Sequence, residues 1–131
     1  MGRWAVWIAC GAALAGNAGV AQASPNGPLP PPPPCSFALS APAPEGDVVA
    51  ATVQSTGCAA LAVPYLSVAC LQPGDGTAMS CAQAHGADPA RVQVPYRPGV
   101  AYVATGRGCA GWVGLPPAPD CQLLGPDSAT P

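Results

Sequence analysis

Short runs of alternating apolar and polar residues recur between residues 35 and 124, and this period of two is typical of β-strands. The clearest run is Arg91–Tyr96, in which Val92 and Val94 fall on one face while Arg91 and Gln93 fall on the other. Other runs are rich in β-branched residues and end at glycine or proline turn signals. The pattern predicts strands at residues 35–41, 47–56, 65–71, 79–84, 91–96, 100–105 and 121–124.

Helical patterns are missing from the sequence. No window combines apolar residues at three- and four-residue spacing with a capping residue at its start. Short strands separated by frequent turns are typical of all-β proteins. We therefore predict a small antiparallel β-sandwich.

The N-terminus has the layout of a secretory signal peptide. Arg3 precedes a largely apolar, uncharged run, and Ala21–Ala23 supplies the small residues that a signal peptidase accepts. We predict cleavage after Ala23, so that residues 1–23 are the signal peptide. The apolar run is shorter than the roughly 20 residues of a membrane span, which disfavours an uncleaved anchor. A lipoprotein modified at Cys10 is a weaker alternative, and no membrane span is expected after cleavage.

Prolines mark the segments on both sides of the predicted strands. Residues 24–34 read SPNGPLPPPPP, a composition that favours an extended polyproline II linker. We expect the folded domain to occupy residues 35–125. Residues 126–131 contain two further prolines and are predicted to form a disordered tail.

Cysteine usage indicates a disulfide framework. One of the seven cysteines leaves with the signal peptide, and an even number remains in a short exported chain. No C-x-x-C pair occurs, which argues against a zinc site. The six cysteines that we expect in disulfides are Cys35, Cys58, Cys70, Cys81, Cys109 and Cys121.

One segment resembles the tyrosine corner of immunoglobulin-like and fibronectin type III domains. Residues 96–102 read YRPGVAY, and the resemblance assigns the turn to Pro98 and Gly99 and the backbone-bonding tyrosine to Tyr102. It covers residues 91–105 and implies an Ig-like sandwich stabilised by three disulfides. Ala104 stands where antibody-type domains place a core cysteine, so a disulfide through the core is not implied. A Pro-Gly turn in another β-fold is the alternative.

Placing the cysteines on such a sandwich gives expectations for their pairing. Cys70 and Cys81 flank a predicted hairpin, which can bring them within bonding distance. For the other four we prefer Cys58–Cys109 with Cys35–Cys121, because this fold would gather all four near one end. The pairing Cys35–Cys58 with Cys109–Cys121 competes with it.

Charge and composition indicate where the protein is located and which classes of partner are not expected. The chain after Ala23 has three arginines, six acidic residues and no lysine, so a nucleic-acid partner and a polybasic membrane patch are not expected. A composition heavy in Ala, Gly and Pro is associated with bacterial genomes rich in G and C. We expect the protein in the cell envelope or secreted outside the cell.

Catalytic chemistry finds little support. The single histidine, His85, lies near Asp88, but no nucleophile-elbow serine, carboxylate pair or phosphate loop accompanies it. A solvated loop histidine explains it adequately. We predict a protein that is not an enzyme and has no cofactor or metal.

Binding is the remaining class of function. On the sandwich, Arg107 and Trp112 would lie in the loop after strand 100–105, and both residue types often anchor interfaces. Alternatively, Trp112 packs against the end of the sandwich. We predict a secreted, non-enzymatic protein that binds an unknown protein or cell-envelope ligand. The rivals are a disulfide-rich protease inhibitor and a hydrolase that uses His85.

Overall fold

The computed structural model describes residues 33–116 and 120–131. Within these residues, every regular element of secondary structure is a β-strand. The predicted signal peptide and residues 24–32 of the linker lie outside the described residues. The strands are β1 (Cys35–Leu39), β2 (Ala43–Glu45), β3 (Val48–Cys58), β4 (Ala62–Pro73), β5 (Ser80–His85), β6 (Ala90–Pro95), β7 (Tyr102–Trp112) and β8 (Asp120–Ala129). Each predicted strand is present, and β2 is an addition.

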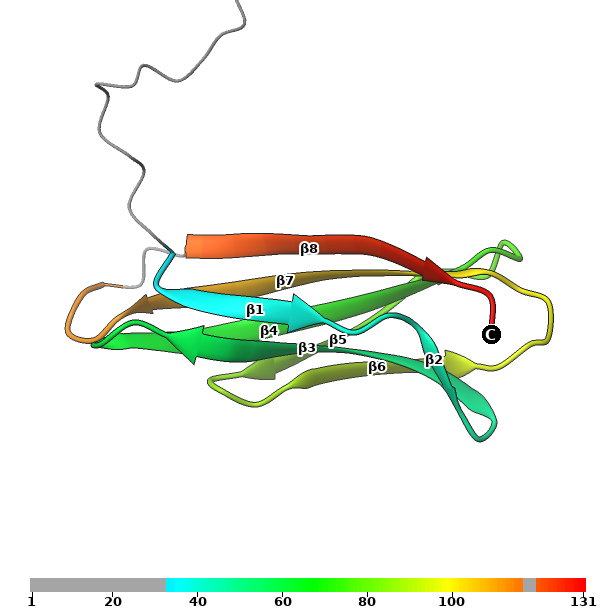
Figure 1. Ribbon diagram of the computed structural model, residues 1–131, viewed down its shortest axis with the longest axis horizontal. Helices are drawn as coiled ribbons and strands as arrows, with labels where there is room; N and C mark the ends of the chain where they lie inside the picture. The colour runs from blue at the N-terminus through cyan, green and yellow to red at the C-terminus, as the bar shows by residue number, and fades with distance from the viewer. Residues whose placement is uncertain (1–32, 117–119) are drawn as a thin grey trace, which may run out of the picture. The chain divides into compact units, whose positions relative to one another are not determined.

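The strands form two antiparallel sheets that pack face to face (Figure 1). In the first sheet, β1 and β2 pair with β3 along its length, and β6 pairs with the opposite edge of β3. The second sheet has the order β5-β4-β7-β8. This arrangement confirms the predicted all-β fold with two antiparallel sheets, as in a β-sandwich.

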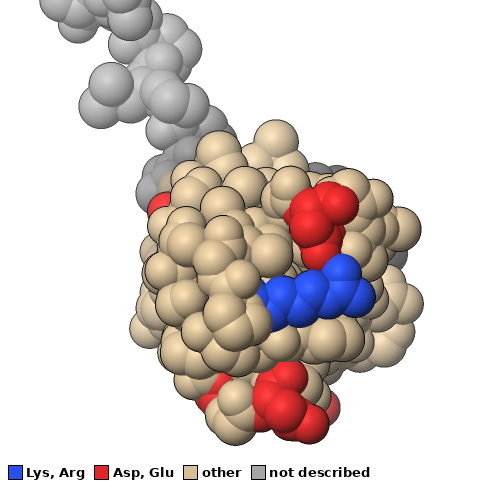
Figure 2. Space-filling model, turned by 90° about the vertical axis from the view of Figure 1, so that its right-hand side faces the viewer, with Lys and Arg blue, Asp and Glu red and all other residues tan. Residues whose placement is uncertain are grey.

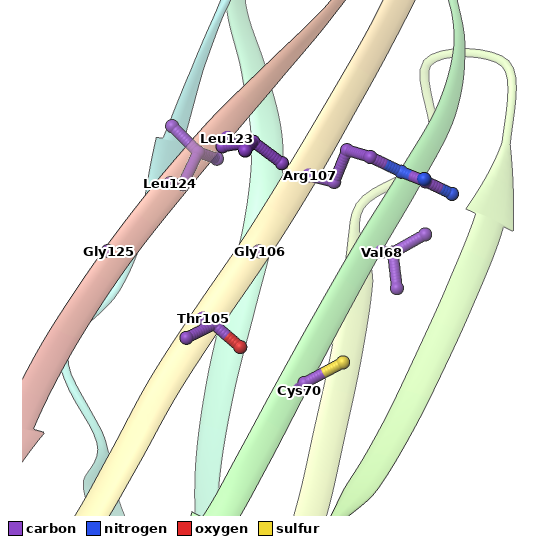
Figure 3. Close-up of a pocket in the computed structure, with 8 residues that line it drawn as sticks. All are labelled: Val68, Cys70, Thr105, Gly106, Arg107, Leu123, Leu124 and Gly125. Atoms are coloured by element: carbon purple, nitrogen blue, oxygen red, sulfur yellow. The ribbon is translucent and has the colours of Figure 1, made fainter.

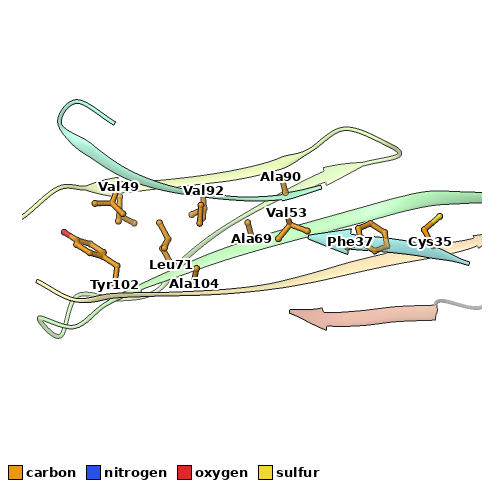
Figure 4. Packing of buried hydrophobic residues seen from close by; sticks show 13 residues of the cluster. Cys35, Phe37, Val49, Val53, Ala69, Leu71, Ala90, Val92, Tyr102 and Ala104 are labelled. Atoms are coloured by element: carbon orange, nitrogen blue, oxygen red, sulfur yellow. The ribbon is translucent and has the colours of Figure 1, made fainter. Parts of the chain in front are cut away.

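The core lies between the sheets and follows the predicted alternation. In β6, Val92 and Val94 are buried and Arg91 and Gln93 are exposed. Small and branched side chains fill the interior, and Tyr102 is the largest fully buried one. Figure 4 shows Val49, Val53, Val92, Leu71, Tyr102 and Ala104 meeting between the two layers.

Glycines let β7 pass close under the first sheet. A Cβ atom added at Gly108 would lie 2.1 Å from Cγ of Phe37, and one at Gly106 would lie 2.5 Å from Cγ2 of Val53. Real Cβ atoms do not approach other atoms so closely. These two positions therefore need glycine, although glycine is unfavourable in strands in general.

The tyrosine corner has the expected hydrogen bonds. The Tyr102 hydroxyl accepts from the backbone N–H of Arg97 at 2.9 Å and donates to the Pro95 carbonyl at 3.0 Å. Gly99 in the turn has a φ of 79°, a left-handed conformation that glycine adopts readily. The buried ring thereby ties the β6–β7 connection to the core.

The predicted disordered tail is wrong. β8 continues to Ala129, with a bulge at Gly125-Pro126, and the carbonyl of Pro131 accepts a hydrogen bond from the Tyr96 hydroxyl at 3.1 Å. The prolines suggested irregular chain, but β8 is an edge strand that needs bonds on one side only. Proline is tolerated at such an edge and at bulges.

The structure contains the disulfides Cys35–Cys58, Cys70–Cys81 and Cys109–Cys121. The Cys70–Cys81 prediction is confirmed. The preferred pairing of Cys58 with Cys109 and Cys35 with Cys121 is wrong, and the competing pairing is the one observed. The reason is register, because each disulfide joins residues directly opposite each other on neighbouring strands.

Each disulfide fastens an edge strand to its inner neighbour. Cys35–Cys58 holds β1 to β3, Cys70–Cys81 holds β5 to β4, and Cys109–Cys121 holds β8 to β7. None of the three links one sheet to the other. The contact between the sheets therefore depends on the apolar core.

Candidate binding surfaces

Arg107 and Trp112 lie in strand β7, which corrects their prediction as neighbours in a loop. They are five positions apart along an extended strand, or about 16 Å. Side chains at odd spacing also point to opposite faces of a sheet. The structure thus separates the two residues into different surfaces.

Trp112 belongs to an apolar cluster at one end of the sandwich. The side chain is 38% exposed, so it is partly accessible to solvent while most of its surface is covered. Further exposed apolar residues lie at the same end, on the β3–β4 turn, the start of β4 and the turn after β7. We refer to the cluster Leu61, Val63, Trp112, Val113 and Leu115 as the Trp112 pole.

Backbone pairing holds the pole together. Ala62 lies opposite Trp112 in the β4–β7 ladder, and the Val113 N–H donates to the Leu61 carbonyl at 2.8 Å. The Leu115 N–H donates to the Trp112 carbonyl at 3.2 Å, which closes a turn. The two turns are therefore fixed side by side rather than independently mobile.

Leu61 has an unusual backbone conformation. Its φ of 65° is the one positive φ of a non-glycine residue in the part of the chain that the structure describes. Bulky residues seldom occupy this left-handed region, which costs them about 1–2 kcal/mol. Its side chain is 74% exposed, so it gains little from packing in return. Such uncompensated strain occurs preferentially at functional positions.

The Trp112 pole carries no charge. Neither residues 59–63 nor residues 111–116 include an acidic or basic residue. The chain also enters the sandwich beside this pole, where the Pro34 carbonyl accepts from the N–H of Ala59 at 2.8 Å. Sequence reasoning missed the leucines and valines of the pole, although apolar residues at turn positions were a signal that could have found them.

Arg107 lies on the outer face of the β5-β4-β7-β8 sheet. The pairing register places Gln83, Val68, Arg107 and Leu123 in one row across the four strands. Beside this row is a shallow groove of about 430 Å³, which we refer to as the Arg107 groove (Figure 3). Its lining residues are Val68, Cys70, Thr105, Gly106, Arg107, Leu123, Leu124 and Gly125.

Arg107 differs from the other two arginines that the structure describes. Arg91 forms an ion pair with Glu45, and Arg97 forms one with Asp75. Arg107 makes no ion pair with any residue in the described ranges. Its guanidinium is therefore available to an anion from outside.

The opposite pole carries the Arg97–Asp75 pair. Figure 2 looks onto this end and shows a basic side chain beside an acidic one. Hydrogen bonds from the side chain and backbone of Thr77, followed by the charge of Arg97, lower the pKa of Asp75 from its ordinary 3.8 to about 2. A small cavity of about 80 Å³ adjoins the pair, and the buried Tyr102 also lines it. The charges here brace the tyrosine corner.

His85 ends β5 with its side chain exposed, opposite Leu66 of β4. It forms no hydrogen bond with Asp88 or with a serine in the described part of the chain. Within residues 33–116 and 120–131, no three His, Cys, Asp or Glu side chains are grouped closely enough to hold a metal ion.

Comparisons were made with protein-family models, curated proteins and solved structures, and none of the three finds a match. Separately, none of the described residues forms a helix of the length and apolar character needed to cross a bilayer.

Proposed function

We propose that this chain is an exported, non-enzymatic binding protein that attaches to a protein or cell-envelope component through the Trp112 pole. The observation that carries the proposal is the clustering of exposed apolar side chains. Five of the seven large hydrophobic residues exposed in the described ranges belong to this one pole. Contiguous exposed apolar patches usually mark interaction sites, because soluble proteins otherwise keep such surface small.

Two further features support a binding role. The pole centres on the tryptophan of the chain after Ala23, and tryptophan buries a large area at low entropic cost when a partner covers it. Leu61 keeps an exposed, strained conformation that stability alone does not favour. A partner that covers the pole would explain both the exposed tryptophan and the strained, exposed leucine.

The fold supports the proposal through its resemblance to immunoglobulin-like and fibronectin type III domains. Such sandwiches carry their loops at two ends, and binding residues often sit on loops that a rigid scaffold holds in place. The hydrogen bonds of the tyrosine corner agree with that resemblance. The Trp112 pole would correspond to one of these loop-bearing ends.

The disulfides support export. Three disulfides in a domain of this size are typical of an oxidising compartment outside the cytoplasm. We propose that a bacterial cell secretes the chain after cleavage at Ala23, and that residues 24–34 space the sandwich from whatever the N-terminus meets.

Protease inhibition is the second candidate. The Cys109–Cys121 disulfide closes the β7–β8 connection, and Val113 and Leu115 are exposed within that closed loop. A constrained, exposed loop is the general requirement for occupying a protease cleft without being released quickly. Titration against a panel of serine and cysteine proteases tests this candidate, and the absence of any inhibition removes it.

Sedimentation with isolated cell envelopes tests the main proposal. The protein, residues 24–131, is mixed with envelopes of the producing cell and centrifuged. Leu115→Asp should greatly reduce the bound fraction, because a charge at the pole must be desolvated on binding. Met79→Asp, at an exposed methionine in the connection between β4 and β5, is the matched control and should bind normally. Equal binding of the two variants would show that the Trp112 pole is not the attachment surface.

A further inference from the structure

The Arg107 groove combines an apolar floor with one unpaired positive charge. Val68 and Leu123 supply outward apolar side chains, Thr105 adds a hydroxyl, and Leu124, which packs against the core, completes the lining on β8. Gly106 and Gly125 contribute only backbone atoms to the lining between strands β7 and β8. The volume of about 430 Å³ lies within the range of small-molecule sites, which is roughly 300–1,000 Å³.

The position of Arg107 divides the groove into two ends. Arg107 is paired with Val68 in the ladder, and in Figure 3 its side chain runs from β7 across β4 above Val68. Leu123 and Leu124 lie on the other side of β7, on strand β8. A ligand in the groove would therefore meet a cation at the β4 end and the aliphatic side chain of Leu123 at the β8 end.

The charges around the groove favour an anion. Strands β4, β5 and β7 contain no Asp or Glu, and in β8 the acidic residues are Asp120 and Asp127, away from Leu123. Arg107 has no acidic partner among the described residues, so an anionic ligand would displace only water from it. The single permanent cation matches one negative charge better than the two charges of a phosphate monoester. A planar carboxylate also fits the guanidinium fork with two parallel hydrogen bonds.

We infer that the Arg107 groove binds a linear aliphatic monocarboxylate, with the carboxylate on Arg107 and the hydrocarbon chain over Leu123. This site is separate from the Trp112 pole and does not depend on the proposed function. Since the groove is open to solvent, its selectivity rests on the charge of the headgroup together with the apolar floor.

Calorimetric titration of residues 24–131 with dodecanoate, kept below its micelle-forming concentration, tests the inference. We expect saturable binding with one dodecanoate per chain. Arg107→Gln should weaken binding at least about tenfold, because a charge-assisted bidentate contact is lost. The matched control is Arg91→Gln, at an exposed arginine on the other sheet, and it should leave the affinity unchanged. Dodecyltrimethylammonium, with the same chain and the opposite charge, should bind at least about tenfold more weakly.

The same titrations contain the results that would overturn the inference. No binding, equal binding by Arg107→Gln, or equal affinity for the cationic amphiphile would each do so. Trp112 provides an internal marker, because a ligand in the groove should leave its fluorescence unchanged. If dodecanoate instead shifts Trp112 emission and Leu115→Asp abolishes binding, the ligand occupies the Trp112 pole, which contradicts the groove assignment and leaves the proposed function standing.

Discussion

At the scale of single residues, several positions are explained by the atoms that surround them. Glycine at 108 is required by the ring of Phe37, the one phenylalanine of the chain, and not by a turn. Tyr102 is buried yet fully bonded, so its hydroxyl costs little to bury. Leu61 is the exception, because its conformation is strained and its side chain is exposed.

Gly108→Ala should destabilise the fold by about 2–3 kcal/mol, since the added methyl overlaps the Phe37 ring and forces the sheets apart locally. Urea unfolding followed by circular dichroism measures the loss. Gly111→Ala, in the same strand with no atom within 4 Å of the added Cβ, should change stability by less than about 0.5 kcal/mol. A small effect at both positions would mean that β7 does not approach Phe37 as described.

Leu61→Gly should stabilise the protein by about 0.5–1 kcal/mol, because glycine adopts a φ of 65° without the steric cost that leucine bears. The same change should weaken binding to envelopes, since it removes an exposed apolar side chain from the Trp112 pole. Thermal unfolding and envelope sedimentation give the two readouts. A loss of stability together with unchanged binding would contradict the functional interpretation of this residue.

The lowered pKa of Asp75 predicts that the folded protein becomes less stable at acidic pH. Its pKa is lowered in the folded state, so its contribution is fully present above the ordinary value of 3.8 and is lost as the pH falls through about 2. We expect the urea midpoint to fall between pH 4 and pH 2 in the natural protein. The fall should be smaller in Asp75→Asn, which cannot titrate. Parallel pH profiles for the two proteins would show that the Thr77 and Arg97 contacts are unimportant in solution.

At the scale of strands, the sequence predicted where strands exist better than where they end. β7 was expected to stop at residue 105, because Gly106, Gly108 and Gly111 weaken any local preference for strand. Two of those glycines are required by side chains of the opposite sheet, and local sequence does not contain that information. The predicted strand 121–124 ended too early for a similar reason, because β8 bulges at Gly125-Pro126 rather than ending there.

Local sequence was sufficient to predict only one of the three disulfides. The hairpin that contains Cys70 and Cys81 is a local element, so that pair could be predicted. The remaining cysteines pair according to the registers of β1 with β3 and of β7 with β8. Once β7 is known to reach Trp112, Cys109 falls within the strand and directly opposite Cys121.

Removing the Cys109–Cys121 disulfide with the double substitution Cys109→Ala/Cys121→Ala should cost about 3 kcal/mol, the amount expected for closing a loop with a sequence separation of 12. The loss should be accompanied by faster hydrogen exchange in β8, because this edge strand is bonded to β7 alone within the sheet. Urea unfolding and amide exchange provide the measurements. Unchanged protection of β8 would show that backbone pairing alone holds it.

At the scale of the whole molecule, period-two alternation and the Pro-Gly corner were sufficient to predict the sandwich. They were insufficient for the site, because Arg107 and Trp112 are close in sequence but belong to different surfaces of a long strand. The leucines and valines of the Trp112 pole come from the β3–β4 turn, the start of β4 and the turn after β7, which only the β4–β7 pairing brings together. The proposed binding surface therefore depends on tertiary neighbours that no single segment reveals.

Fluorescence of Trp112 tests the central claim most directly. In residues 24–131 this is the one tryptophan, so its emission reports on the pole alone. We predict that adding cell envelopes shifts its emission to shorter wavelength and protects it from acrylamide quenching, because the 38% exposed side chain becomes covered. The Met79→Asp control should behave in the same way. If the protein sediments with envelopes while Trp112 emission and quenching stay unchanged, attachment occurs elsewhere and the account is wrong.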